Sequence, residues 1–288
     1  MLKFGRGRSN EPGERQVEVM WPRSGDDRPV IYLGDHTALT RLRSGHKIYV
    51  DTRDVGIASH LMLDGIWETW VENALMPEIK PGMTFYDIGA NFGYYTLLGA
   101  RAVGPNGRVF AFECNPRLNK LLRQSVMVNG LAGMTTVIAS AVSDRTGTVK
   151  LTTDLEFSGG GTTLPASPTS QWTREQIEVP CAPLDELAPP ESPANVIKID
   201  VEGAEPLVFA GADRVLSNRA LGTIVFEFYA PTISLSQPPA AFLERVASYG
   251  FSLQAITPEG VQTAKTPAAL LESIGKQMTY VMGRRSAA

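Results

Sequence analysis

The feature that most constrains the fold is an alternation, after Gly82, of short apolar runs with segments of helical periodicity. The runs VFAF, NVIKI and TIVFEF are almost continuously apolar, which is typical of strands covered on both faces. Strands separated by helices of roughly ten to fifteen residues form βαβ crossovers. The chain is therefore predicted to build an α/β fold around a doubly wound, mostly parallel sheet.

The pattern places the individual elements along the chain. Strands are expected at 84–90, 108–114, 135–142, 195–201, 222–228, 251–256 and 278–283, with an additional edge strand over Thr146–Thr153. Helices are expected at 94–103, 116–128, 204–216 and 240–248. The proline-rich stretch 181–193 is interpreted as a stiff connector. The long polar loop 154–172, with Gly159–Gly161, is either a disordered segment or a functional lid.

The chain ahead of this pattern divides into two parts. Residues 1–28 are rich in Gly, Pro, Arg and Glu, which favours a loosely ordered arm. Residues 29–80 are interpreted as an N-terminal cap, with a hairpin over 38–50 and one helix over 57–79. Residues 81–288 then form the main domain.

Composition limits the classes of protein to consider. Lys plus Arg is 27 and Asp plus Glu is 30, so the formal charge is −3 and no nucleic-acid partner is expected. There is no secretory signal and no run of ~20 apolar residues, so we expect no transmembrane segment. The two cysteines lie far apart, outside any Cys-x-x-Cys pattern, which fits a cytoplasmic protein. Nothing in the composition excludes a homo-oligomer.

The segment FYDIGANFGYYT, residues 85–96, joins the first strand to the first helix. Gly89 permits a tight turn, and Gly93 lets the helix pack near the sheet. Because position 91 is Asn, the dinucleotide fingerprint G-x-G-x-x-G is not present. Asp87 suits a cationic amino group, so a nucleoside that carries an amino acid fits better than a dinucleotide.

Glu113 ends the next strand, 24 residues after Gly89. An acidic side chain at that tip can accept hydrogen bonds from both hydroxyls of a ribose. The pair Asp87 and Glu113 therefore predicts a nucleoside cofactor site at the carboxyl edge of the sheet.

Three motifs occur in order: DIGANFGYYT, FECNP and KIDVEGAE. Over about residues 65–255 the chain thereby resembles the FkbM family of S-adenosylmethionine-dependent methyltransferases. The resemblance implies a Rossmann-like class I methyltransferase fold, with seven strands of which the last is antiparallel, and S-adenosylmethionine as cofactor. It also implies that 81–288 is the methyltransferase domain.

The resemblance further implies a set of cofactor-binding residues. Asp87, Gly89, Asn91 and Gly93 would surround the methionine part, Glu113 would hold the ribose, and Ala141 or Val142 would lie against adenine. The same set includes Ala90, Thr96, Cys114 and Asp200.

Lys198, Asp200 and Glu202 lie at alternate positions, so they share one face of a strand and its exit. Glu227 lies near the tip of the adjacent strand, and these four are the candidate catalytic residues. Asp200 and Glu227 could hold a divalent cation such as magnesium. Alternatively, one carboxylate or Lys198 acts as a base without metal. A plainer interpretation is a Lys198–Asp200 ion pair, with Glu205 at a helix N-terminus.

The resemblance implies O-methylation of a hydroxyl on a sugar, glycan or secondary metabolite, so the expected partner is a small-molecule or glycan acceptor. His60 is an alternative base, although a structural role in the cap is the simpler interpretation. Two other functions stay open: a nicotinamide-dependent oxidoreductase on a similar sheet, and a non-catalytic binding module. The missing glycine of the dinucleotide fingerprint speaks against the first, and the intact acidic residues speak against the second.

Overall fold

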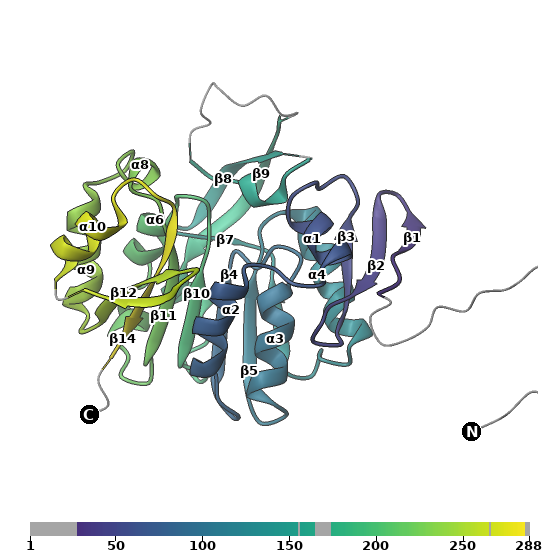
Figure 1. Ribbon diagram of the computed structural model, residues 1–288, viewed down its shortest axis with the longest axis horizontal. Coiled ribbons are helices and arrows are strands. Elements are labelled where there is room, and N and C mark those ends of the chain that lie inside the picture. Colours follow the sequence, from purple (N-terminus) through teal and green to yellow (C-terminus); the bar gives the residue numbers. More distant parts are fainter. Residues whose placement is uncertain (1–27, 155, 165–173, 265, 286–288) are drawn as a thin grey trace, which may run out of the picture.

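The computed structural model describes residues 28–154, 156–164, 174–264 and 266–285 (Figure 1). Its centre is an eight-stranded sheet in the order β13-β12-β14-β11-β10-β4-β5-β6. The strands span, in that order, Gly260–Thr263, Ser252–Thr257, Thr279–Arg284, Thr223–Phe228, Val196–Ile199, Thr84–Ile88, Arg108–Phe112 and Thr135–Ile138. β14 runs antiparallel to both of its neighbours, whereas β11, β10, β4, β5 and β6 are mutually parallel. The predicted fold class is confirmed, and β13 is added as an edge hairpin partner of β12.

Helices cover both faces of this sheet, each over its own apolar cluster. One face packs against α5 (Leu184–Leu187), α6 (Glu205–Ala210), α7 (Asp213–Ser217), α8 (Ala230–Ile233), α9 (Pro239–Ser248) and α10 (Pro267–Ile274). The other packs against α1 (Ile57–Leu63), α2 (Thr69–Leu75), α3 (Tyr94–Val103) and α4 (Pro116–Val128). Along β10, Ile197 and Ile199 face the first cluster, while Val196 faces the second. This alternation is why the strands are apolar on both sides.

The cap contains a separate three-stranded sheet of β1 (Ile31–Gly34), β2 (Thr37–Arg41) and β3 (Lys47–Asp51). The hairpin expected over 38–50 is confirmed as β2 and β3. β3 lies beside α4, where the Tyr49 amide donates to Ser125 Oγ at 2.9 Å. The division of the chain at residues 80 and 81 stays a prediction.

The helix expected over 57–79 is wrong as a single element. It divides into α1, α2 and the 3₁₀ turn η1 (Met76–Glu78). Gly65 and Glu68 both have left-handed backbone, with φ of 69° and 42°, and this conformation cannot continue an α-helix. The helix expected over 204–216 is also divided, at Gly211. A Cβ at Gly211 would lie 2.0 Å from the Ser143 carbonyl oxygen, so the backbones approach closely there.

The strand expected over 135–142 is likewise wrong as one strand. β6 ends at Ile138, and β7 (Ala141–Ser143) joins a third sheet in the order β7-β9-β8. β9 (Arg174–Pro183) pairs with β7 and with β8 (Gly147–Asp154), so the predicted edge strand belongs to this sheet rather than the central one. β9 and α5 also replace the first part of the connector expected over 181–193.

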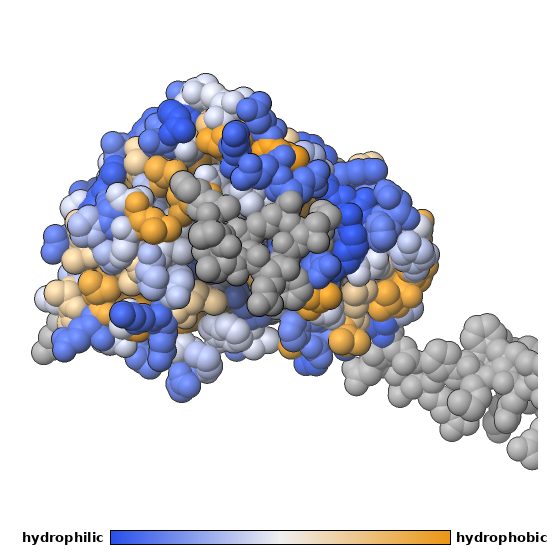
Figure 2. Space-filling view, turned by 90° about the horizontal axis from the view of Figure 1, so that it is seen from above, coloured by the Kyte–Doolittle hydropathy of each residue, from blue (hydrophilic) through white to orange (hydrophobic). Residues whose placement is uncertain are grey.

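The arm expected over 1–28 lies outside the described residues except for Arg28. No helix in the described part of the chain is long and apolar enough to cross a membrane. Seen from above, hydrophilic residues cover most of the coloured surface, and apolar residues lie among them in small patches (Figure 2).

Candidate active site

The turn between β4 and α3 is shaped by close contact with the exit of β10. Gly89 has φ of 79°, and a Cβ there would lie 1.7 Å from the Asp200 carbonyl oxygen. Gly93 caps α3 with φ of 95°, and a Cβ there would lie 2.3 Å from Leu122 Cδ1. Asn91 between them is also left-handed, with φ of 51°. Only glycine fits the first two positions, so the predicted turn is built as the spacing suggested.

Asp87 is fully buried behind this turn and lines neither of the two cavities described below. Its Oδ2 accepts a hydrogen bond of 2.6 Å from Thr96 Oγ1. Its Oδ1 has no partner among the described residues. Burial raises the pKa of Asp87, and the charge of Lys198 opposes that shift. The hydrogen bond between Asp87 in β4 and Thr96 in α3 therefore joins the two elements on either side of the turn.

Glu113 follows the end of β5, with 7% of its surface exposed. Its Oε2 accepts from the Asn91 amide at 2.8 Å and its Oε1 from the Asn115 amide at 2.7 Å. Asn115 also caps α4 by accepting from the Arg117 amide. Burial raises the pKa of Glu113 to about 7, despite the two amide donors.

A first cavity lies over this turn and brings together residues from β4, β5, β7 and β10. Of the predicted cofactor-binding residues, Gly89, Ala90, Asn91, Glu113, Cys114, Ala141, Val142 and Asp200 line it, whereas Asp87, Gly93 and Thr96 lie outside its wall. Lining residues that the sequence did not indicate include Tyr94, Tyr95, Phe112, Leu118 and Ser158. Ser158 Oγ lies 3.3 Å from Asn91 Oδ1, so η2 (Ser158–Gly160) contacts the turn directly.

Lys198 and Asp200 form the predicted ion pair, with Lys198 Nζ 2.9 Å from Asp200 Oδ2. The Tyr280 hydroxyl donates to the same oxygen at 2.8 Å. Lys198 Nζ also lies 4.9 Å from the centre of the Tyr95 ring. Burial alone would lower the pKa of Lys198, but the charges of Asp200 and Asp87 outweigh it and the pKa is raised.

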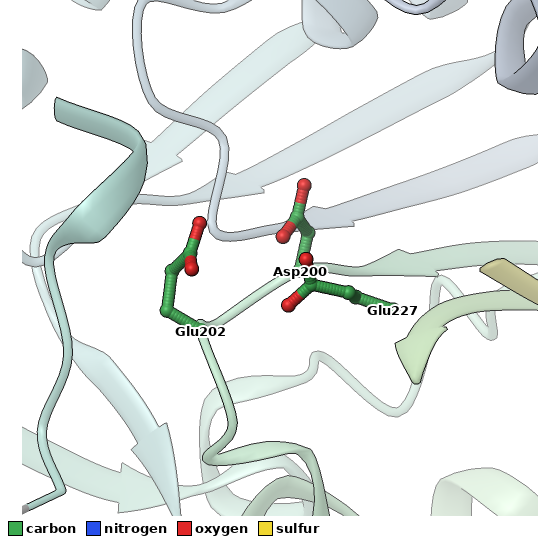
Figure 3. Close-up of side chains that lie close together, drawn as sticks. All are labelled: Asp200, Glu202 and Glu227. Atoms are coloured by element: carbon green, nitrogen blue, oxygen red, sulfur yellow. The ribbon is translucent and has the colours of Figure 1, made fainter. Parts of the chain in front are cut away.

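Three of the four predicted catalytic residues gather their carboxylates at one point (Figure 3). One oxygen each from Asp200, Glu202 and Glu227 lies within 4.8 Å of the others. Burial, followed by the charge of Asp200, raises the pKa of Glu202 and of Glu227 well above its usual range. Glu202 has left-handed backbone with φ of 55°, and its carbonyl oxygen accepts from Thr162 Oγ1.

Glu68 is a fourth carboxylate that the sequence did not indicate. Burial and the charge of Asp200 raise its pKa to about 7. Glu205 is fully buried beside the group and accepts from the amides of Val201 and Gly203, as expected for the start of α6.

A second cavity of about 630 Å³ opens beside the carboxylates. Its wall combines aromatic rings with acidic side chains, including Trp67, Trp70, Tyr229, Tyr280, Glu68, Glu202 and Glu227. Ile57, Trp67, Gly159, Asp200 and Glu202 line both cavities, so the two meet at the carboxylates. The described residues of this wall include neither Lys nor Arg.

His60 lies at the wall of the second cavity rather than among the carboxylates. Its Nδ1 is 3.1 Å from Asp64 Oδ2, and its ring centre is 5.5 Å from that of Trp67. Of the predicted lid, residues 154 and 156–164 are described, whereas residue 155 and residues 165–172 lie outside the described part of the chain.

The chain matches the family model of the methyltransferase FkbM domain over residues 87–253. A protein-L-isoaspartate O-methyltransferase of Aeropyrum pernix is 37% identical over 59 residues, which is 20% of this chain and 23% of that protein. The match therefore spans about a quarter of that relative's length.

Solved methyltransferases are similar to the chain at low identity. A putative rRNA methylase of Clostridium thermocellum has a TM-score of 0.46 at 14% identity, covering 76% of this chain and 96% of that one. An S-adenosylmethionine-dependent O-methyltransferase of Thermotoga maritima has a TM-score of 0.42 at 14% identity, covering 87% and 78%.

Proposed function

This chain belongs to the FkbM methyltransferase family, and we propose that it transfers a methyl group from S-adenosylmethionine to a hydroxyl of a sugar, glycan or secondary metabolite. The observation that carries the proposal is the junction of two cavities at Asp200 and Glu202. One cavity suits the methyl donor and the other suits the acceptor, so the transferred group would cross at the carboxylates.

The first cavity has the chemistry that S-adenosylmethionine requires. Glu113 uses one lone-pair direction of each oxygen on a backbone amide, which leaves acceptor capacity for two ribose hydroxyls. Ala141 and Val142 offer an apolar wall for adenine, and Gly89 and Asn91 would border the methionine end. When bound, this cofactor supplies a methyl group on a positively charged sulfur, which the acidic surroundings of Asp200 favour.

The second cavity supports a neutral, ring-shaped acceptor. Aromatic side chains such as Trp67 and Tyr229 offer flat apolar surfaces on which a sugar or another ring can stack. An acceptor with phosphate or carboxylate groups would meet several acidic side chains and, among the described lining residues, neither Lys nor Arg. A volume of about 630 Å³ lies within the range of small-molecule sites.

The residues around Asp200 would position and deprotonate the acceptor. Lys198 and Tyr280 hold Asp200 by one oxygen, which orients its carboxylate towards the junction. A carboxylate of this group would take the hydroxyl proton as the oxygen attacks the methyl carbon. Removal of water from the junction would assist a transfer in which the positive charge of the sulfur disappears.

The test is transfer of tritiated methyl from S-adenosylmethionine to fractionated cell extract, followed by mild alkali. Label in a glycan or metabolite fraction that survives alkali indicates a methyl ether, as we expect. Label lost in alkali would indicate a methyl ester and refute the hydroxyl acceptor. Protein that binds S-adenosylmethionine but labels no fraction would favour a non-catalytic module. Mass spectrometry of polysaccharides and metabolites with and without the gene should then show the loss of one methyl group from the acceptor.

A further inference from the structure

We propose that Asp200, Glu202 and Glu227 form a binding site for one divalent metal ion, of the type of Mg²⁺ or Mn²⁺, where the two cavities meet. We assign the ion the role of holding the acceptor hydroxyl, and this role rests on the proposed function. The binding of the ion to the protein does not depend on that function. The three residues come from the exits of two adjacent strands, β10 and β11. Their carboxylates gather at one point in Figure 3.

Asp200 is oriented as a ligand by the groups around it. Its Oδ2 accepts from both Lys198 Nζ, at 2.9 Å, and the Tyr280 hydroxyl, at 2.8 Å. Its Oδ1 has no donor among the described residues. A carboxylate held by one oxygen presents the other in a constant direction, which is how outer partners orient metal ligands.

Glu227 provides an observation that does not depend on the distances within the group. Only 8% of its surface is exposed, its carboxylate lies at the wall of the second cavity, and no hydrogen bond from another described residue reaches it. Its side chain nevertheless points towards Asp200, from the neighbouring strand (Figure 3). A carboxylate with so little exposure and no donor among the described residues would be stabilised by a cation at the cavity wall, so this side chain suits a positively charged ligand.

The donor set and the spacing suit a hard cation. All three ligands are carboxylates, and Mg²⁺ and Mn²⁺ prefer oxygen ligands. Oxygen atoms within 4.8 Å of one another can bind one ion with small side-chain movements. Asp200 and Glu202 also line both cavities, so the remaining coordination positions would face the acceptor.

The test measures binding of Mn²⁺ to the full-length protein by electron paramagnetic resonance, without cofactor or acceptor. We expect one ion per chain, displaced by added Mg²⁺. Glu227→Gln should weaken the binding of Mn²⁺ roughly 10-fold or more, because the amide keeps the shape but loses the charge. The matched control is Glu113→Gln, which changes another buried glutamate that lines the first cavity but not the second and should leave Mn²⁺ binding as it is.

Binding of S-adenosylmethionine by Glu227→Gln, measured by calorimetry, shows that the variant is folded. Wild-type protein that binds no Mn²⁺, or Glu227→Gln that binds it as tightly as wild type, would overturn the metal site. Methyl transfer that persists in a chelator, together with absent Mn²⁺ binding, would overturn the metal site but keep the proposed function. Mn²⁺ binding that Glu227→Gln abolishes supports the site even where no acceptor is labelled, which would count against the function alone.

Discussion

Glu113→Gln should weaken the binding of S-adenosylmethionine through the loss of one charge-assisted hydrogen bond. In the wild type, each carboxylate oxygen accepts one backbone amide, at 2.7 and 2.8 Å, and keeps capacity for one ribose hydroxyl. Glutamine offers a single acceptor oxygen, and its NH₂ group must face either an amide donor or a hydroxyl. A hydrogen bond to a charged group contributes ~1.5–3 kcal/mol. The dissociation constant should therefore rise roughly 10–150-fold.

The pH dependence separates this effect from a general distortion. Burial raises the pKa of Glu113 to about 7, and ribose hydroxyls hydrogen-bond best to the ionised form. Wild-type affinity should therefore increase as the pH rises through 7, by up to about tenfold between pH 6 and pH 8. The variant has no ionisable group at this position. The ratio of variant to wild-type dissociation constants should then grow over that range.

The raised pKa of Glu113 also predicts that the free energy of unfolding of the cofactor-free protein depends on pH. The folded pKa of Glu113 lies above that of an unfolded glutamate, so the folded state binds more protons between about pH 4.5 and 7. The free energy of unfolding of the wild type should therefore fall, relative to the variant, as the pH rises through that window. A shift of this size corresponds to about 3 kcal/mol. Calorimetric titrations at pH 6, 7 and 8, with urea unfolding alongside, measure both effects. A constant ratio of dissociation constants across pH would refute the assignment of Glu113 to the ribose.

Three further substitutions test other parts of the site. Asp200→Asn should lower the turnover rate by ~10²–10⁴ in a methyl-transfer assay at saturating S-adenosylmethionine; full activity would contradict its role at the junction. Gly89→Ala, with φ of 79° and a Cβ 1.7 Å from the Asp200 carbonyl oxygen, should lower the free energy of unfolding by more than ~2 kcal/mol in urea and abolish cofactor binding. Thr96→Val removes the hydroxyl that donates to buried Asp87 and should cost ~1–3 kcal/mol of stability, whereas Thr96→Ser, the control, should cost much less.

The sequence predicted those parts of the fold that depend on local pattern. Helices α3 and α4 begin and end where their periodicity and caps indicated, and the sheet follows the apolar runs. The predictions that were wrong concern segments whose pairing partners lie far away in the sequence. Residues 135–142 divide because Ala141 pairs with Cys181, which lies 40 positions further along the chain. The local sequence does not predict such a pairing, because the order of apolar and polar residues within a strand does not identify the sheet to which the strand belongs.

In the site, too, the residues that belong to sequence motifs were predicted, whereas those brought there only by tertiary contacts were not. The sequence indicated Glu113, Asp200, Glu202 and Glu227 because each follows or ends an apolar strand. The sequence did not predict Glu68 and Tyr280 as site residues, because they come from the cap and from the last strand. Glu68 lies in a left-handed turn between two helices, where an acidic residue has no distinguishing neighbour in the sequence.

Lys198 connects the two ends of the site through charge. It lies beside Asp87 in the parallel register of β10 and β4, and it forms the ion pair with Asp200. One buried ammonium, 2% exposed, therefore serves both the turn under the cofactor and the group at the junction. Three further carboxyl groups, Glu68, Glu202 and Glu227, surround this ion pair, and their pKa values are raised; a positively charged ligand at the junction would favour their ionised forms. A sulfonium brings such a charge, and methyl transfer removes it. The same electrostatics that favour entry of the methyl donor thus favour release of its neutral product.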